Sequence, residues 1–124
     1  MKVKCGTDII EISRIRECIE SLGEKFLKKV YTEEEIKYCE SKKSQKYQHY
    51  AARFAAKEAV FKAISDSLPD KFILGWQDYE ISNDETGKPN VKINGANLED
   101  IENIEISISH CKEYAIATAI AIYK

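Results

Sequence analysis

Residues 47–68 read YQHYAARFAAKEAVFKAISDSL, and they carry the strongest structural signal in the chain. Its large apolar residues recur at helical spacing on one face: Phe54, Phe61, Ile64 and Leu68. Its alanines line nearly the opposite face: Ala52, Ala56, Ala59 and Ala63. The spacing predicts a helix over 47–67, which ends before Pro69. Because a helix that is apolar on two sides packs on both, we expect it to lie against a sheet or against another subunit.

The chain before this helix is predicted to hold one strand and three shorter helical segments. Periodicity and end signals place them at 3–9 for the strand and at 13–22, 24–30 and 33–40 for the helices. Thr32 and Glu35 form a capping box that begins the third of these helices. The polar residues 42–46 read as a linker to the long helix.

The chain after the long helix reads as strands. They are predicted over 76–82, 90–94, 104–109 and 115–122, with a short helix over 96–101. One helical half and one β half predict an α+β protein. A length of 124 residues fits a single domain over 1–124.

The composition excludes several classes of protein. A net charge of -2 gives no basic field for nucleic acid, and no apolar run is long enough to span a bilayer. The four cysteines include no C-x-x-C pair, which argues against a zinc site and against a disulfide framework. We therefore expect a cytoplasmic protein with free thiols, no nucleic-acid partner and no membrane insertion.

Glu58 and Lys62 are the first candidates for chemistry. They lie four residues apart on the predicted long helix and therefore share a face. The simpler interpretation is an ion pair on an exposed helix, which is the commoner case. The alternative is a carboxylate at the margin of the apolar face, where Lys62 or a metal ion must neutralise it.

Asp8 adds a second carboxylate directly after an apolar strand, although a turn residue before the next helix would look the same. Two carboxylates that meet at a strand end, together with waters and phosphate oxygens, form the kind of site that Mg²⁺ prefers. Arg53, Lys57 and Lys62 would then donate hydrogen bonds to phosphate oxygens. This set favours phosphoryl-linked chemistry over proteolysis or redox chemistry.

Four stretches together resemble the successive motifs of the holo-acyl-carrier-protein synthases. They are GTDIIEI at 6–12, RFAAKEAVFKA at 53–63, GKP at 87–89 and SISHCKEYA at 107–115. Their order and approximate spacing also match, and the resemblance covers nearly the whole chain. It implies the 4′-phosphopantetheinyl transferase fold, in which one long central helix packs on a mainly antiparallel sheet.

The resemblance implies a reaction with coenzyme A as co-substrate. The 4′-phosphopantetheine group of coenzyme A is transferred to a serine hydroxyl of apo acyl carrier protein, and adenosine 3′,5′-bisphosphate leaves. Mg²⁺ holds the diphosphate and neutralises its growing charge, and Mn²⁺ is a second candidate ion.

The resemblance also assigns the catalytic residues. Asp8 and Glu58 are the expected metal ligands, and Lys62 is expected at the phosphates. Larger relatives carry a third acidic ligand where this chain has Ile10, so a water is expected in that coordination place. The serine proton is expected to go to Glu58 or to a metal-bound water that Glu58 orients, and the sequence leaves both open.

Further residues are implied to bind coenzyme A: Arg53, Lys57, Lys62, Gly87, Lys88, Pro89 and His110. Residues 87–89 resemble the loop at the adenine and ribose, but a β-turn explains them without a ligand. His110 resembles a phosphate-binding histidine, but it could equally be a turn residue with a hydrogen-bonded ring. Cys111 stands where relatives carry threonine, which puts a hydroxyl contact there in doubt.

The implied protein partners are an apo acyl carrier protein and further copies of this chain. Arg14, in the basic segment 12–29, is expected to contact the acidic carrier, whereas Arg16 reads as part of a solvated face. Relatives of this size are homotrimers with active sites at subunit boundaries. The apolar faces of this chain are compatible with a homotrimer, although internal packing explains them equally well.

Two other functions are weaker interpretations. A non-catalytic module that binds coenzyme A would be favoured if a catalytic residue were missing, but Asp8, Glu58 and Lys62 are all present. A different magnesium phosphotransferase should carry a Gly-rich phosphate loop, and this chain has none.

Overall fold

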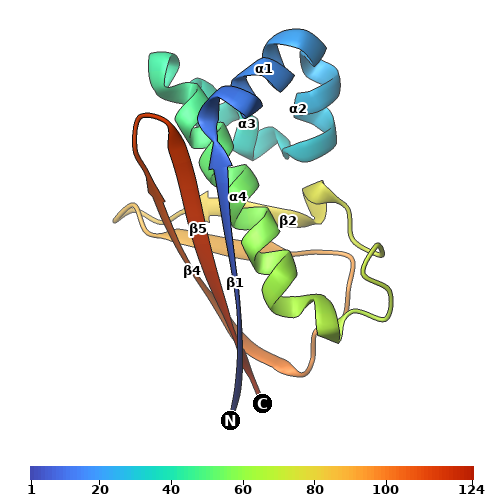
Figure 1. The fold of residues 1–124 in the computed structure, drawn as a ribbon. Helices are drawn as coiled ribbons and strands as arrows, with labels where there is room; N and C mark the ends of the chain where they lie inside the picture. Colours follow the sequence, from blue (N-terminus) through green and yellow to red (C-terminus); the bar gives the residue numbers. More distant parts are fainter.

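The structure, a computed structural model, describes all residues from Met1 to Lys124. Its centre is α4 (Lys46–Ile64), the long helix predicted over 47–67. The α-helical geometry ends earlier than predicted because Ser65–Ser67 continue as a 3-10 helix. Figure 1 shows α4 crossing one face of an antiparallel sheet, which confirms the predicted α+β class with a long central helix. None of the helices combines the length and the apolar composition that crossing a membrane requires.

The larger sheet has the strand order β1–β5–β4. β1 (Lys2–Glu11) and β4 (Ile101–His110) both pair antiparallel with the central β5 (Tyr114–Tyr123). The strand β5 turns four buried alanines toward the core: Ala115, Ala117, Ala119 and Ala121. These small side chains allow α4 to lie close to the sheet.

The closest approach of β1 to α4 is at Gly6. A Cβ atom at this position would lie 2.2 Å from the carbonyl oxygen of Ala59 and 2.7 Å from the Cβ of Lys62, so no larger residue fits. Asp8 lies two residues further along β1 and therefore on the same face of the strand. The glycine thus brings Asp8 toward the part of α4 that carries Glu58 and Lys62.

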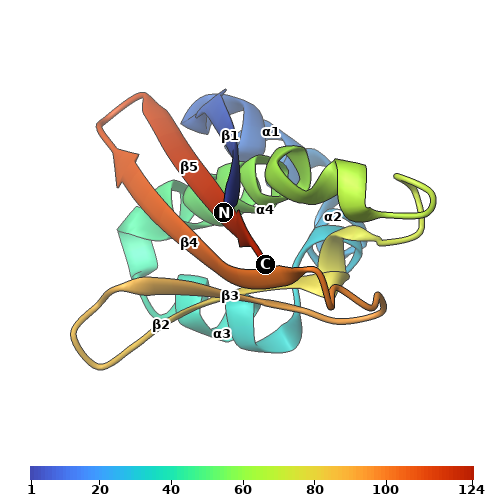
Figure 2. The same cartoon turned by 90° about the horizontal axis from the view of Figure 1, so that it is seen from below.

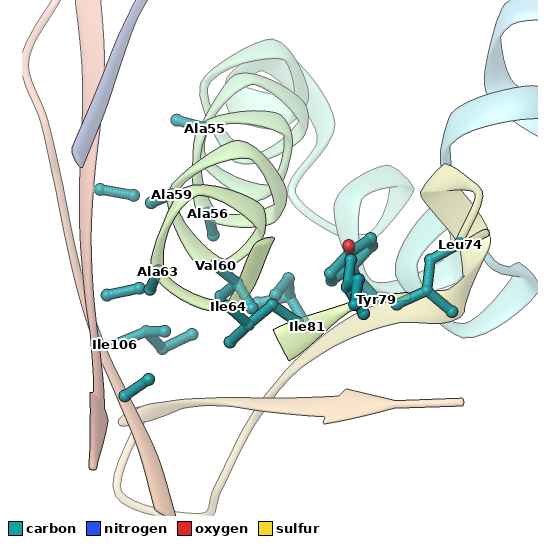
Figure 3. Packing of buried hydrophobic residues seen from close by; sticks show 14 of the residues in the cluster. Ala55, Ala56, Ala59, Val60, Ala63, Ile64, Leu74, Tyr79, Ile81 and Ile106 are labelled. Carbon is teal, nitrogen blue, oxygen red and sulfur yellow. The ribbon is translucent and has the colours of Figure 1, made fainter. Parts of the chain in front are cut away.

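A hairpin covers another side of α4. It consists of β2 (Tyr79–Asn83) and β3 (Pro89–Ile93), which pair antiparallel. In Figure 3, Ala55, Ala59 and Ala63 lie on the side of α4 that faces the larger sheet, while Val60 and Ile64 lie toward Ile81 of β2. The helix is therefore buried on two sides, as its pattern predicts.

The short helices α1 (Ile12–Leu22), α2 (Glu24–Val30) and α3 (Glu33–Glu40) gather around the first half of α4 (Figure 1). They form a second hydrophobic cluster with it, which includes Ile15, Tyr31 and Tyr50. The predicted capping box at the start of α3 is confirmed: the Glu35 N–H donates to Thr32 Oγ1 at 3.2 Å, and the Thr32 N–H donates to Glu35 Oε1 at 2.9 Å.

Three local predictions were wrong. Residues 96–101 form no helix: the chain makes a turn in which the Ile101 N–H donates to the Leu98 carbonyl at 3.0 Å, and Ile101 already begins β4. So few residues cannot offset the cost of starting a helix. Trp76–Asp78 is a 3-10 helix rather than the start of a strand, and Lys43–Gln45 is a 3-10 helix within the expected linker.

Candidate active site

Asp8 and Glu58 line one pocket. Its volume is about 300 Å³, and its wall also includes Arg14 and Phe54. Asp8 is supplied by β1, Glu58 by α4 and Arg14 by α1. The structure thus places both carboxylates that were expected to bind a metal, and the arginine that was expected to meet the carrier, on the wall of the same pocket.

Glu58 carries a charge that the chain leaves largely uncompensated. Burial raises the pKa of Glu58, the Asp8 carboxylate raises it further, and Lys62 opposes both. Lys62 itself pairs with Asp8: its Nζ donates to Asp8 Oδ1 at 3.3 Å and to the Thr7 carbonyl at 3.0 Å. No ion pair of the chain includes Glu58. The site therefore holds two carboxylates and one ammonium group.

This donor set fits a magnesium ion better than a zinc ion. No group of three or more histidine, cysteine or acidic side chains could hold a metal ion, whereas structural and catalytic zinc sites use at least three protein ligands. Mg²⁺ is usually held by one or two carboxylates and completes its shell with waters and substrate phosphates. Asp8 and the unpaired Glu58 supply that number of carboxylates.

Lys57 corrects one sequence-based assignment. It was expected to bind phosphate, but its side chain is fully buried and its Nζ is already occupied. The Nζ donates to Glu35 Oε1 at 2.6 Å, to the Val30 carbonyl at 2.7 Å and to the Trp76 carbonyl at 2.9 Å. An ammonium group that makes three such bonds in the interior has no donor left for a ligand. Lys57 therefore holds α4 against its neighbours.

Arg53 is connected to the predicted nucleotide loop by Asn83. The guanidinium is only 3% exposed and lies over the ring of Tyr38, at 4.0 Å from its centroid. Its Nη2 donates to Asn83 Oδ1 at 2.8 Å, and the Asn83 amide donates to the Gly87 carbonyl at 3.0 Å. The Nε atom of Arg53 is buried and has no partner. Arg53 thus fixes the loop through Asn83, while its buried Nε–H stays without an acceptor.

The loop itself is a tight turn. Asp84 Oδ1 accepts from the backbone N–H groups of Thr86 and Lys88, at 2.9 and 3.0 Å, and Gly87 has a φ of 89°. Pro89 begins β3, directly after the turn. The exposed Lys88 pairs with Glu105 of β4 at 3.3 Å. A β-turn therefore explains residues 87–89 without a ligand. Their contact with a nucleotide stays a prediction.

His110 ends β4 and packs against a second histidine. The ring centroids of His49 and His110 are 5.7 Å apart, and His49 also meets the edge of Tyr38 at 5.6 Å. Burial, together with Lys42, His110 and Arg53, lowers the pKa of His49 to about 4, so it is neutral near pH 7. His110 is exposed beside this neutral ring. Cys111 is exposed in the turn that follows.

The expected site residues fall into two groups. The carboxylate group, Asp8, Glu58 and Lys62, lies where β1 approaches α4. The cationic group, Arg53, Lys88 and His110, lies at the hairpin turn and the end of β4. Figures 1 and 2 show the β2–β3 turn projecting past the β4 edge of the larger sheet, whereas β1 forms the opposite edge. The turn after β2 and the strand β1 therefore lie at opposite edges of the larger sheet.

A comparison with known families settles the relationship of the chain. The sequence model described as the 4′-phosphopantetheinyl transferase superfamily matches residues 4–119. The chain belongs to this superfamily. The resemblance read from the four motifs is therefore confirmed.

Individual transferases are similar to this chain over nearly its whole length. A holo-[acyl-carrier-protein] synthase of Ruminiclostridium cellulolyticum is 46% identical over 125 residues, which cover 97% of this chain and 92% of that protein. One of Chlamydia muridarum is 46% identical over 118 residues, covering 94% and 91%.

Solved structures of such synthases share the fold. The Helicobacter pylori enzyme in complex with coenzyme A has a TM-score of 0.82 at 29% identity, covering 95% of this chain and 99% of that chain. The Bacillus anthracis enzyme in complex with CoA (3′,5′-ADP) has a TM-score of 0.77 at 31% identity, covering 98% and 96%.

Two residues of this transferase were missed by the sequence reasoning. Glu35 was recognised only as a capping residue, yet it is also the buried partner of Lys57 and accepts from the Ile81 N–H at 2.8 Å. Asn83 was read as part of a loop. Its position directly before the predicted turn was a weak signal, but nothing in the sequence shows that it faces Arg53, which lies 30 residues away.

Proposed function

We propose that this chain transfers the 4′-phosphopantetheine group of coenzyme A to a serine of an apo acyl carrier protein, with Mg²⁺ held by Asp8 and Glu58. Membership of the superfamily and the similarity to holo-[acyl-carrier-protein] synthases support the reaction. The observation that carries the assignment of residues is the shared pocket of Asp8, Glu58 and Arg14, with an unpaired carboxylate at its wall.

The chemical step replaces a phosphoanhydride bond of coenzyme A with a phosphate ester of the carrier serine. The serine oxygen forms a bond to the phosphorus that bears the pantetheine, and the bond from that phosphorus to the bridging oxygen of the diphosphate breaks. The serine proton passes to Glu58, directly or through one water, and the bridging oxygen leaves with adenosine 3′,5′-bisphosphate. When bound, the metal ion neutralises charge on the diphosphate oxygens.

The chain's own residues account for position and proton transfer. Lys62 is half exposed beside Asp8, so its ammonium can turn toward a phosphate oxygen without leaving a buried acceptor unpaired. The raised pKa of Glu58 makes it a better proton acceptor than an ordinary glutamate. Both properties follow from the partial burial of this pocket.

The carrier protein is proposed to dock on α1 and α2. Among the basic residues there, Arg16 is paired with Glu20 at 3.4 Å and Lys28 with Glu24 at 3.3 Å. Arg14 has no ion pair and lies on the wall of the carboxylate pocket. An acidic surface beside the carrier serine would therefore meet Arg14 first, and electrostatic attraction would speed the encounter.

We propose a homotrimer whose active site is completed between copies. The outward face of the larger sheet exposes apolar side chains, including Val3, Ile9, Ile116 and Ile120. Such a patch is typical of a surface that another chain covers. A second copy could also bring its cationic group, with Arg53 and His110, to the carboxylate group of the first.

The cytoplasmic location stays a prediction. All four cysteines are free: Cys5, Cys18, Cys39 and Cys111. Free thiols persist in a reducing compartment, which supports this location.

The reaction is tested by incubating the protein with coenzyme A, Mg²⁺ and an apo acyl carrier protein and measuring the intact mass of the carrier. We expect the mass of one phosphopantetheine group to be added, and addition to stop when a chelator removes the metal ion. The control is a separate reaction in which a known synthase modifies the same carrier. A carrier that gains mass in that reaction but not with this protein would contradict the proposal.

The shared site is tested by mixing two inactive variants. One chain carries Glu58→Gln, and the other carries Lys88→Ala with His110→Ala. If each site uses both groups from different copies, random exchange of subunits restores about a quarter of the wild-type activity. No recovery, with exchange verified by mass spectrometry, would place the whole site within one chain.

A further inference from the structure

A second pocket shares Glu58 with the first. It has a volume of about 300 Å³, and its wall combines the apolar side chains of Phe61, Phe72, Leu74 and Trp76 with the charged residues Lys57, Glu58 and Lys71. Trp76 stacks on Phe54 of the first pocket, with ring centroids 4.6 Å apart and an interplanar angle of 25°. Glu58 and this aromatic stack therefore form the boundary between the two pockets.

This second pocket contains an unexplained polar group, the hydroxyl of Tyr79. The side chain belongs to β2, is almost fully buried and lines the pocket, yet its hydroxyl has no hydrogen-bond partner. Figure 3 shows the Tyr79 oxygen pointing away from Ile64 and Ile81, so the hydroxyl is turned out of the hydrophobic cluster. A buried hydroxyl without a partner destabilises the folded chain, and such a group in a native protein calls for an explanation.

The hydroxyl is a donor under all ordinary conditions. Burial and the neighbouring charges of Asp78 and Glu58 raise the pKa of Tyr79 to about 12. A neutral phenol among apolar side chains suits an uncharged acceptor, such as an amide carbonyl or an alcohol.

We propose that Tyr79 binds the phosphopantetheine arm of coenzyme A by donating a hydrogen bond to an amide or hydroxyl oxygen of that arm in the second pocket. This inference rests on the proposed function. The arm is an extended, uncharged chain with apolar segments between two amides, which matches the apolar part of this wall and the phenol donor behind it. With the diphosphate at Glu58, the arm begins at the boundary of the second pocket. The first pocket, with Arg14 on its wall, is then available to the carrier protein.

The ligand must shift one wall slightly to reach the hydroxyl, which is covered in the free chain. That wall includes Phe72 and Leu74 of the segment between Leu68 and Trp76, which has no regular helix or strand. Phe72 is 79% exposed and makes no part of the hydrophobic clusters. Leu74 belongs to the larger cluster, so Phe72 is the part of this wall that can move without disrupting packing.

The test is the Tyr79→Phe variant, which removes only the hydroxyl oxygen. Binding of coenzyme A and of adenosine 3′,5′-bisphosphate, which lacks the arm, is measured by calorimetry. We expect the variant to bind coenzyme A about 3- to 10-fold more weakly, as for the loss of one hydrogen bond, and the bisphosphate with unchanged affinity. Because an unpaired group is removed, its thermal midpoint should equal or exceed that of the wild type.

Tyr123→Phe is the matched control. Its hydroxyl is also buried, but it accepts from Ser67 Oγ at 2.8 Å, away from both pockets. This control should lose stability and keep both affinities.

Three outcomes separate the claims. Unchanged binding of coenzyme A by Tyr79→Phe, or equal weakening of both ligands, overturns the role of Tyr79. Weakening confined to coenzyme A supports it. Failure of the wild type to bind either ligand overturns the proposed function instead.

Discussion

Two neighbouring residues of α4 show how one helix serves structure and chemistry differently. Lys57 is fully buried, and its ammonium group donates three hydrogen bonds, one of them to Glu35 at 2.6 Å. Glu58, the next residue, has no ion pair and lines two pockets. The charge of Lys57 is fully paired within the fold, which we call closed, whereas the charge of Glu58 has no partner in the chain, which we call open. An unpaired charge at a pocket wall is what a ligand can still stabilise.

The largest expected effect tests the closed side of this comparison. Lys57→Met should destabilise the protein by about 3 to 5 kcal/mol, because it leaves the buried Glu35 carboxylate without its partner. Unfolding by denaturant measures the loss. The same substitution at Lys62 is the control: Lys62 is half exposed and its pair with Asp8 stays in contact with solvent, so its removal should cost less, about 1 kcal/mol. Equal losses at both positions would remove the distinction between the two pairs.

The next effect tests the open side. Glu58→Gln keeps the shape of the side chain but removes the charge that we propose holds the metal ion and accepts the proton. If Glu58 has the proposed roles, turnover of apo carrier protein should fall by about 10²- to 10³-fold or more, the usual loss for a group that stabilises a transition state. Thermal unfolding should be unimpaired, since no contact of the chain is broken. A variant with normal turnover would show that the open carboxylate is not catalytic.

The same contrast explains how much the sequence could predict. The long helix, the alternating strands and the capping box follow from periodicity and local hydrogen bonding, which depend on residues close in the chain. The position of Lys57 did not follow, because its acceptors Val30, Glu35 and Trp76 come from three other segments. By charge and spacing alone, Lys57 and Lys62 looked alike as phosphate donors.

The approach of Asp8 to Glu58 was more predictable than the fate of Lys57. Gly6 lies in a recognisable motif, and a glycine in a strand indicates that another backbone lies close. The helix predicted over 96–101 was wrong for the opposite reason. Its local pattern was helical, but Ile101 pairs with Tyr123, so the end of that segment belongs to the sheet. Tertiary pairing overrode a weak local preference.

Arg53 is intermediate between Lys57 and Glu58, because its guanidinium is paired within the chain only in part. Asn83 binds its Nη2, while its buried Nε has no partner. Asn83→Ala should break the link to Gly87 and raise the KM for coenzyme A by about 3- to 10-fold with little change in kcat, because the loop would be less ordered before binding. Asn90→Ala, in the same hairpin, should change neither constant. A fall in kcat at constant KM would assign Asn83 to the chemical step instead.

The smallest expected effect is the pH dependence of stability that Glu58 imposes. Its pKa is raised in the folded chain, first by burial and then by Asp8, so the folded state binds this proton more readily than the unfolded state. The ionised side chain therefore destabilises the fold at neutral pH, and this penalty disappears as the pH falls through the raised pKa toward the ordinary glutamate value.

In metal-free buffer, Glu58→Gln should be slightly more stable than the wild type at pH 7, and the difference should vanish by about pH 4. Added Mg²⁺ should reverse the order at pH 7, because only the wild type binds it well. A wild type that is already the more stable protein without metal would mean that Glu58 has a stabilising partner within the chain, and that it is closed in the same sense as Lys57.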